Sequence, residues 1–333
     1  MSSPRPPFFI VGSPRSGTTL LQKMFEAHPD VCFVHESQFL HMCDLYLQET
    51  SSIFSSVSWN KIWPHYLKSH HFLQQGIPPD QITTYTEGAN ENNWPLPWIE
   101  MLGLQQKRAG RPVLGEKTPH HVLYLETIFR LFPDSRALFL VRDPRAVVPS
   151  MIKANFGPAT IQKAMMQWAT LNAAGLAYRR RYPHRVLDLH YETLILNPEK
   201  TLRNLCDFLK LPFDPGMLKY YELPKEDSPF MQQPIKQGVG QKIYTSSLDQ
   251  WKTTLGTSDL LYIEKRCRLL MEYLDYHPVN ASIKTNTFSR AWLLALALWK
   301  TLRWLFSNNC LTRQCYRSQA IGFWMIFCSV KIK

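Results

Sequence analysis

This sequence of 333 residues contains no Cys-x-x-Cys pair, and its seven cysteines are an odd number. An odd count without close pairs gives no basis for a disulfide framework or a structural zinc site. Reduced thiols are therefore the expected state, and no metal is expected.

Acidic residues are absent from the C-terminal part of the chain, where no Asp or Glu follows Asp275. The same stretch contains eight Lys or Arg residues, which account for most of the formal net charge of +12. The rest of the chain is only mildly basic. A broad nucleic-acid-binding surface is therefore not expected, and nucleic acid is excluded as a partner.

No pattern of a leader segment is visible in the first residues of the printed sequence. The sequence opens with Met-Ser-Ser-Pro-Arg-Pro-Pro and enters the apolar run Phe8-Phe9-Ile10-Val11 directly. We therefore expect neither a signal peptide nor an N-terminal membrane anchor, and we expect a cytoplasmic protein.

Short apolar runs alternate with segments of helical periodicity along most of the chain. The expected strands are 8–11, 31–34, 113–115, 136–141 and 185–189. The expected helices are 18–28, 118–132, a segment from Pro144, 160–181 and 197–209. Strands separated by helices predict an α/β fold, with a parallel sheet flanked by helices and right-handed crossovers.

Residues 50–110 lack this alternation and are rich in Ser, Trp, Asn and Pro. They predict an insertion of loops and short helices in a domain that spans residues 1–285. The insertion could shape a substrate pocket, but its tryptophans could equally belong to the core. These tryptophans are Trp59, Trp63, Trp94 and Trp98.

Residues 286–333 form a basic, apolar tail that we expect to be helical. The run Ala291–Phe306 contains Lys300 and Arg303, and it is shorter than the ~20 residues that a membrane span needs. Helices packed on the domain are the favoured interpretation. A basic amphipathic segment on an anionic membrane is the alternative.

The segment Gly12-Ser-Pro-Arg-Ser-Gly17-Thr18-Thr19 follows a predicted strand and opens a predicted helix. Glycines at this spacing let backbone N–H groups turn toward a phosphate, and the helix N-terminus adds the positive end of its dipole. Thr18 stands where nucleotide triphosphatases have a lysine, and no strand ends in a clear acidic ligand for magnesium. The P-loop-type turn therefore predicts phosphate binding without a metal.

At this point the sequence resembles the sulfotransferase superfamily, most closely the branch of protein-tyrosine sulfotransferases and related bacterial enzymes. The resemblance lies in Pro14–Leu21 followed by Ala27-His28-Pro29, and in Leu140–Ala146 with Ser150 eight residues after Arg142. It implies an enzyme that uses 3'-phosphoadenosine 5'-phosphosulfate (PAPS) and releases 3'-phosphoadenosine 5'-phosphate (PAP). The segments 190–194 and 241–251 agree with it.

The donor-binding residues follow from these segments. The loop is assigned to the 5'-phosphosulfate and the pair Arg142 and Ser150 to the 3'-phosphate, because a guanidinium and a hydroxyl can hold a phosphate dianion. The full donor-binding set is Pro14, Arg15, Ser16, Gly17, Thr18, Thr19, Arg142, Ser150, Tyr191, Lys242, Ser246 and Ser247.

Sulfuryl transfer needs a base for the acceptor and a cation for the leaving phosphate. The resemblance implies Glu36 as the base and Lys117, in Gly115-Glu116-Lys117-Thr118-Pro119, as the cation. His35 is the rival base, since other sulfotransferase branches use histidine.

Two departures from the tyrosine-sulfotransferase pattern leave the acceptor open. Ala154 replaces an arginine, and Gln250 replaces a lysine before Trp251. The acceptor could be a small molecule, a carbohydrate, a lipid or a peptide, and a homodimer is compatible with the sequence. The competing functions are a P-loop nucleotide kinase or triphosphatase and a PAPS-binding scaffold without activity.

Overall fold

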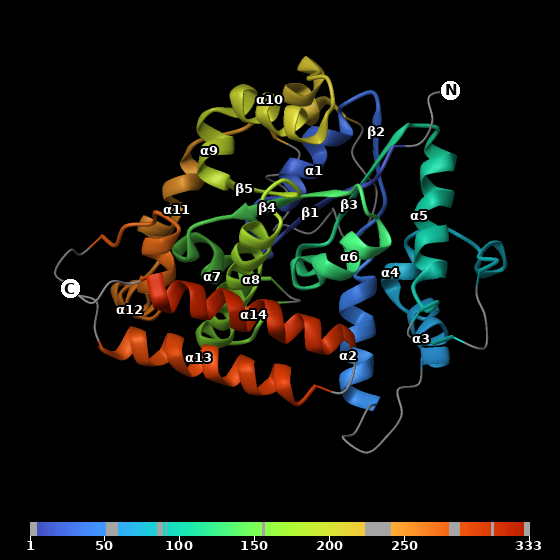
Figure 1. Ribbon diagram of the computed structural model, residues 1–333. Coiled ribbons are helices and arrows are strands. Elements are labelled where there is room, and N and C mark those ends of the chain that lie inside the picture. Colours follow the sequence, from blue (N-terminus) through green and yellow to red (C-terminus); the bar gives the residue numbers. More distant parts are fainter. Residues whose placement is uncertain are drawn as a thin grey trace.

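The computed structural model describes residues 5–50, 59–84, 89–90, 92–154, 157–223, 241–279, 287–307 and 310–329. Its centre is a parallel sheet of five strands in the order β2-β3-β1-β4-β5 (Figure 1). The strands are β1 (Phe8–Gly12), β2 (Val31–Phe33), β3 (Val113–Lys117), β4 (Arg136–Val141) and β5 (Val186–His190). The predicted α/β fold with a flanked parallel sheet is confirmed.

The two faces of the sheet are covered by different helices because side chains alternate along each strand. Phe8 and Ile10 of β1 point into one core, and Phe9 and Val11 point into the other. The first core is closed by α1 (Thr18–Glu26), α9 (Tyr191–Leu196), α10 (Pro198–Leu209) and the 3-10 segment η4 (Pro215–Glu222). The second is closed by helices that include α6 (Leu125–Leu131) and α8 (Ile161–Arg181).

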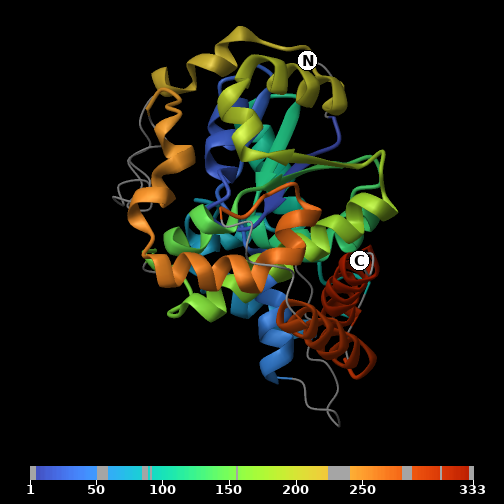
Figure 2. The ribbon, with the colours of Figure 1, turned by 90° about the vertical axis from the view of Figure 1, so that its left-hand side faces the viewer.

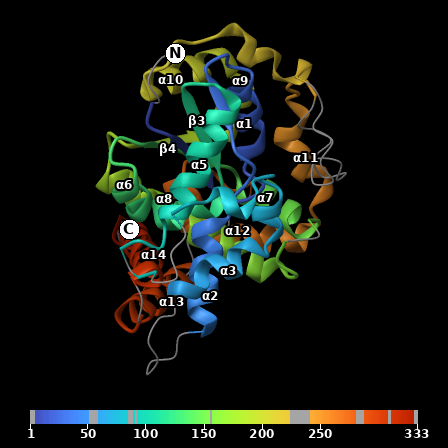
Figure 3. The same ribbon diagram turned by 90° about the vertical axis from the view of Figure 1, so that its right-hand side faces the viewer.

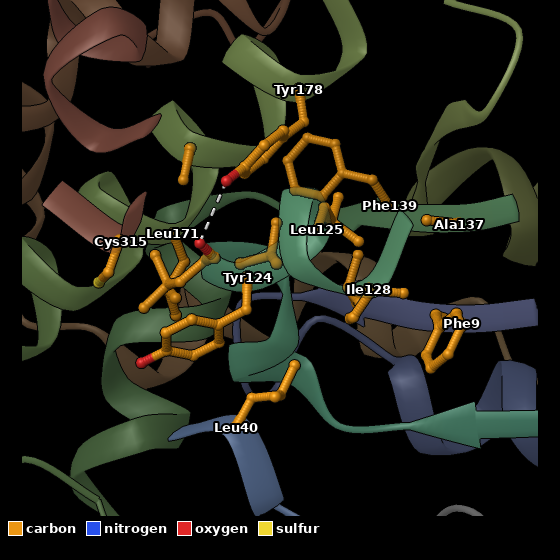
Figure 4. Close-up of a cluster of buried hydrophobic side chains, with 14 of the residues drawn as sticks. Phe9, Leu40, Tyr124, Leu125, Ile128, Ala137, Phe139, Leu171, Tyr178 and Cys315 are labelled. Atoms are coloured by element: carbon orange, nitrogen blue, oxygen red, sulfur yellow. Dashed lines mark hydrogen bonds between the residues drawn. The ribbon is translucent and has the colours of Figure 1, made fainter. Parts of the chain in front are cut away.

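The predicted helix over 118–132 divides into two elements. A 3-10 segment, η3 (Pro119–Tyr124), precedes α6. Figure 4 shows Tyr124, Leu125 and Ile128 turned into the same core as Phe9 and Phe139. Burial of this cluster therefore outweighs the local preference for a continuous helix.

The segment after β2 consists of helices and loops, in agreement with the predicted insertion. It contains α2 (Phe39–Thr50), η1 (Trp59–Lys61), α3 (Ile62–Leu67), α4 (His70–Leu73), η2 (Pro79–Gln81) and α5 (Leu96–Ala109). Trp63, Trp94 and Trp98 are buried, and the rings of Trp94 and Trp98 stack on Phe39 with centroids 5.6 and 5.4 Å away. These tryptophans are therefore core residues.

Helices α7 (Pro144–Ile152), α11 (Ser246–Thr254) and α12 (Thr257–Tyr273) lie beside the carboxyl edge of the sheet (Figure 2). The tail is helical, as predicted, with α13 (Thr287–Leu305) and α14 (Cys310–Ser329). A Cβ at Gly322 of α14 would lie 1.8 Å from the carbonyl oxygen of Ala173, so α14 and α8 touch backbone to backbone. The division into a domain of residues 1–285 and a tail stays a prediction.

No helix within the described ranges is long and apolar enough to span a lipid bilayer.

Candidate active site

The loop between β1 and α1 is a tight turn that only glycine permits at two positions. Gly12 has φ 148° and a Cβ there would lie 2.4 Å from the Leu140 carbonyl oxygen. Gly17 has φ 95° and a Cβ there would lie 2.3 Å from the ring of Tyr191. The loop is therefore pressed against β4 and α9, with α1 starting directly behind it.

Ser16 lies inside this turn and is fully buried. Its Oγ has no hydrogen-bond partner among the described residues, and α1 presents its N-terminal N–H groups next to it. A buried hydroxyl of this kind is costly unless a ligand satisfies it. The turn thus has the chemistry of an anion site, with N–H and O–H donors.

Arg15 joins the loop to the second predicted phosphate site. Its backbone has φ 70°, and its Nε donates to Ser150 Oγ at 3.0 Å. One guanidinium nitrogen of Arg142 donates to the Arg15 carbonyl oxygen at 3.3 Å. Burial first, and then the positive charge of Arg142, lower the pKa of the Arg15 guanidinium. Two cations held this close favour an anionic ligand between or beside them.

Arg142 is held from several sides at the end of β4. Its guanidinium lies 4.0 Å from the ring centre of Tyr191, and its other terminal nitrogen donates to the Ser247 carbonyl oxygen at 3.1 Å. Its backbone carbonyl accepts from Trp168 Nε1 at 3.0 Å. These contacts orient the guanidinium toward the same space as Ser150.

A cavity of about 400 Å³ lies beside these residues. Its lining includes the predicted residues Arg15, Gly17, Thr18, Thr19, Arg142, Ser150, Tyr191, Lys242 and Ser247. Pro14 lines a second cavity instead, Ser16 is buried in the turn, and Ser246 is exposed at the first position of α11. The sequence-predicted residues are thus brought together around one basic cavity, with these three at its margin.

Glu36 and Lys117 form an ion pair with 2.7 Å between Oε2 and Nζ. Lys117 is the last residue of β3, and Glu36 follows β2, which is the neighbour of β3 in the sheet. Both side chains are largely buried, and Gln38 Nε2 donates to the other carboxylate oxygen of Glu36 at 2.8 Å. His35 is exposed, so the two neighbours do point to different surroundings.

The second cavity, of about 90 Å³, adjoins this pair. Its lining includes Pro14, Arg15, Glu36, Gln38, His120 and Gln167. Arg15 lines both cavities. Arg15 therefore stands between the two cavities, and Glu36 lines the smaller one.

A buried network behind the ion pair fixes the ends of β2 and β3. Glu116 is fully buried and accepts from Ser37 at 2.8 Å, from Thr118 at 2.5 Å and from His121 Nδ1 at 3.1 Å. Burial alone would raise the pKa of Glu116, but the charge of His121 and these hydrogen bonds lower it overall. The Glu116 carboxylate thus holds Ser37 and Thr118, the residues that directly follow Glu36 and Lys117.

Comparison with known proteins decides the family. Residues 6–215, well over half of the chain, match the family model described as the sulfotransferase family. The chain belongs to the sulfotransferase family. The prediction of a sulfotransferase enzyme with a P-loop-type α/β fold is thereby confirmed.

Several curated relatives of this sulfotransferase-family chain share its sequence at moderate identity. Protein-tyrosine sulfotransferase 1 of Danio rerio is 28% identical over 225 residues, which cover 66% of this chain and 57% of that protein. Protein-tyrosine sulfotransferase 1 of Homo sapiens is 29% identical over 224 residues, which cover 66% and 55%. The chain thus matches little more than half the length of these two relatives.

Solved structures show the same fold. The sulfotransferase domain of the Synechococcus PCC 7002 olefin synthase aligns with a TM-score of 0.56 and 24% identity, over 83% of this chain and 97% of that one. The sulfotransferase domain from the curacin biosynthetic pathway aligns with a TM-score of 0.54 and 22% identity, over 83% and 99%.

Sequence reasoning missed several residues of this sulfotransferase site. Asp143 pairs with Arg145 at 2.6 Å, and Arg145 also binds Glu264 at 2.7 Å and lies 4.2 Å from the ring centre of Trp251. Further unpredicted lining residues are Lys153, Tyr220, Tyr244 and Gln250. Arg145 stands inside the segment 140–146, but its pairing with a glutamate 119 residues away has no local trace in the sequence.

A second overlooked feature is the histidine pair beside Glu36. The rings of His41 and His120 stack 4.4 Å apart, and Gln167 Nε2 lies 2.8 Å from His120 Nε2. Burial lowers the pKa of His120 to about 4, although the Glu36 charge acts in the opposite direction. Burial and His120 also lower the pKa of His41.

These pKa shifts predict acid sensitivity of the fold. A histidine whose folded pKa is depressed contributes stability that is present above its unfolded pKa and is lost as pH falls through the interval to the folded pKa. The free energy of unfolding should therefore fall by about 2 kcal/mol between pH 7 and pH 5 through His120 alone. Urea unfolding at both pH values measures this, and His120→Phe should reduce the difference. An equal difference in wild type and variant would contradict the prediction.

Among the described residues, no group of three or more His, Cys, Asp or Glu side chains could hold a metal ion.

Proposed function

We propose that this protein transfers a sulfuryl group from PAPS to a hydroxyl or amine acceptor, with PAP as the second product. The observation that best supports the proposal is that two cavities share Arg15, and that the smaller one is lined by Glu36 of the ion pair with Lys117. The larger, basic cavity suits the donor nucleotide, and the smaller one suits the acceptor group.

The residues around the larger cavity have complementary roles in this proposal. The N–H groups of the turn, Ser16 Oγ and the start of α1 would bind the 5'-phosphosulfate. Arg142 and Ser150 would bind the 3'-phosphate. Tyr191, Lys242, Ser246 and Ser247 complete the proposed donor site, and Thr18 and Thr19 add hydroxyls at the helix start.

The chemistry is an in-line displacement at sulfur. Glu36 accepts the proton of the acceptor, whose oxygen or nitrogen forms a bond to sulfur while the bond between sulfur and the phosphate oxygen breaks. Lys117 neutralises the negative charge that develops on that oxygen. The separation of 2.7 Å between the two side chains allows both to act on one sulfuryl group.

The small acceptor cavity and the relatives' names make a tyrosine-containing peptide the first acceptor to test, with small phenols, carbohydrates and lipids as comparisons. The side chains of Gln38, His120 and Gln167 would contact the acceptor. A cytoplasmic location and a homodimer stay predictions, which fractionation and sedimentation would test.

Calorimetry with PAP and AMP tests the donor assignment. PAP should bind roughly 100-fold more tightly than AMP, because only PAP offers the 3'-phosphate to Arg142 and Ser150 and each charge-assisted contact stabilises it. Ser150→Ala should weaken PAP binding much more than AMP binding, which loses only the hydrogen bond between Arg15 and Ser150, whereas Thr253→Ala on the exposed side of α11 should change neither. Equal affinities for PAP and AMP would refute the 3'-phosphate site.

The scaffold alternative predicts the same binding without turnover. Incubation with labelled PAPS and the acceptor panel distinguishes the two: PAP binding without transfer to any acceptor would favour the scaffold.

A further inference from the structure

The exposed side of α13 is apolar over its C-terminal half. Leu298, Trp299, Leu302, Leu305 and Phe306 are between 43% and 73% exposed, and they follow the helical spacing i, i+1, i+4, i+7 and i+8. At 100° per residue they fall within one arc of the helix. We call these five residues the α13 face, although Phe306 directly follows the last residue of the helix. Large apolar side chains that are exposed together on one face indicate an interaction surface, whereas single exposed apolar residues do not.

The opposite side of α13 is already occupied. Leu293, Leu296 and Ala297 are buried, and α13 packs along α14, which in turn packs on α8. Figures 1 and 3 show α13 as the outer helix, with α14 next to the body of the protein. The α13 face is therefore held in a fixed orientation and turned away from the core.

Exposed cations lie on the same pair of helices, α13 and α14. Arg303 and Arg313 are exposed, and the Arg317 side chain is 41% exposed. The acids that contact α14 come from other elements. Glu126 pairs with Arg181 and lies 4.0 Å from Arg317, and the buried Asp44 accepts a hydrogen bond from Thr312. Lys284, Lys331 and Lys333 lie outside the described residues, and they extend the excess of cations in the sequence.

An apolar helix face that contains tryptophan, has the exposed Arg303 next to it and belongs to a tail rich in cations matches the surface of an interfacial helix. A helix of 19 residues is about 28 Å long and can lie along a lipid surface. A second copy of the chain fits less well. Two-fold pairing of the α13 face would bring Arg303 toward its own copy, and no acid of the tail could balance the charge.

We propose that the α13 face docks the protein on an anionic lipid surface, with Leu302 and Phe306 in the acyl boundary and the arginines at the phosphate level. The docking is independent of the proposed sulfuryl transfer, because the α13 face contributes no residue to either cavity.

Removal of the whole tail would be a poor test, because Gly322 and Cys315 of α14 belong to packed interior and their loss would expose α8. Substitutions on the α13 face avoid this problem. Leu302→Glu combined with Phe306→Glu places carboxylates where the proposal has acyl chains. Leu73→Glu on α4 is the matched control, since Leu73 is also exposed but lies on another surface.

Co-sedimentation with vesicles of phosphatidylcholine and phosphatidylserine measures the docking. Wild type and Leu73→Glu should bind these vesicles and not vesicles of phosphatidylcholine alone. The double Glu variant should lose at least tenfold in binding, and Arg303→Gln with Arg313→Gln should lose a comparable factor, about fivefold per arginine. Circular dichroism would establish that each variant is folded.

Two outcomes would overturn the proposal. The first is wild-type protein that stays in solution with the phosphatidylserine vesicles, or a double Glu variant that binds them as well as wild type. The second is a dimer in sedimentation that the double Glu variant dissociates without any vesicle binding, which would assign the α13 face to a second copy.

Discussion

Replacing Glu36 with Gln should lower the single-turnover rate of sulfuryl transfer by roughly 100-fold or more at saturating PAPS. The amide keeps the size of the side chain and can still accept a hydrogen bond from Gln38, but it cannot take the acceptor proton. PAP affinity should stay close to that of wild type, because Glu36 lines the smaller cavity and not the nucleotide cavity.

His35→Ala is the matched control for this prediction. His35 is exposed and is not among the residues that line the acceptor cavity, so its loss should change the rate only slightly. A Glu36→Gln variant at wild-type rate together with an inactive His35→Ala variant would transfer the role of base to His35. The reaction class would then stand, and the assignment of the base would be wrong.

Replacing Lys117 with Met should lower the same rate by about 100-fold to 1,000-fold, the range typical of a lost charge-stabilising donor. Methionine fills the buried position at the end of β3 and carries no charge, so the leaving phosphate oxygen loses its counter-ion. The rate at saturating PAPS separates this effect from weaker donor binding.

Lys153→Met tests whether any cation near the nucleotide would have this effect. Lys153 lines the large cavity but is exposed, and no ion pair with Glu36 is described for it. The Lys153→Met substitution should weaken PAP binding and leave the single-turnover rate at saturating PAPS nearly unchanged. A normal saturated rate in Lys117→Met would remove Lys117 from the reaction. Normal rates in both the Lys117 and the Glu36 variants would refute the catalytic proposal as a whole.

The Lys117 and Glu36 variants should also be combined. If the two side chains act in one transition state, the double variant should lose much less than the product of the two single losses. Independent, multiplicative losses would indicate that the ion pair observed here does not act as a unit.

Local patterns were sufficient for the frame of the fold and for the phosphate turn. The strands from Phe8 to Gly12 and from Arg136 to Val141 are continuous apolar runs, as expected for strands that are covered on both faces. The turn at 12–17 was readable because left-handed backbone at Gly17 and close approach at Gly12 both require glycine. Such requirements depend on a few neighbouring residues.

Local patterns did not indicate how distant segments pack. The Ser-, Asn- and Pro-rich stretch before β3 was expected to hold helices and loops, and its longest helix is α5 with 14 residues. Trp98 of this helix stacks on Phe39, from a segment more than fifty residues earlier, and burial of large rings outweighs weak local propensity.

The sequence by itself determined that this chain is a sulfotransferase-family protein with a parallel sheet, because the phosphate turn and the segment after β4 are contiguous motifs whose residue types are dictated by backbone geometry and charge. Only the tertiary structure decided that Glu36 and Lys117 form an ion pair, that Asp143 pairs with Arg145, and that the apolar side of α13 faces outward. These facts depend on which strands are neighbours in the sheet and on which helix covers which. The arrangement of strands and helices depends on the burial of side chains over the whole core, and no short segment of the sequence encodes it.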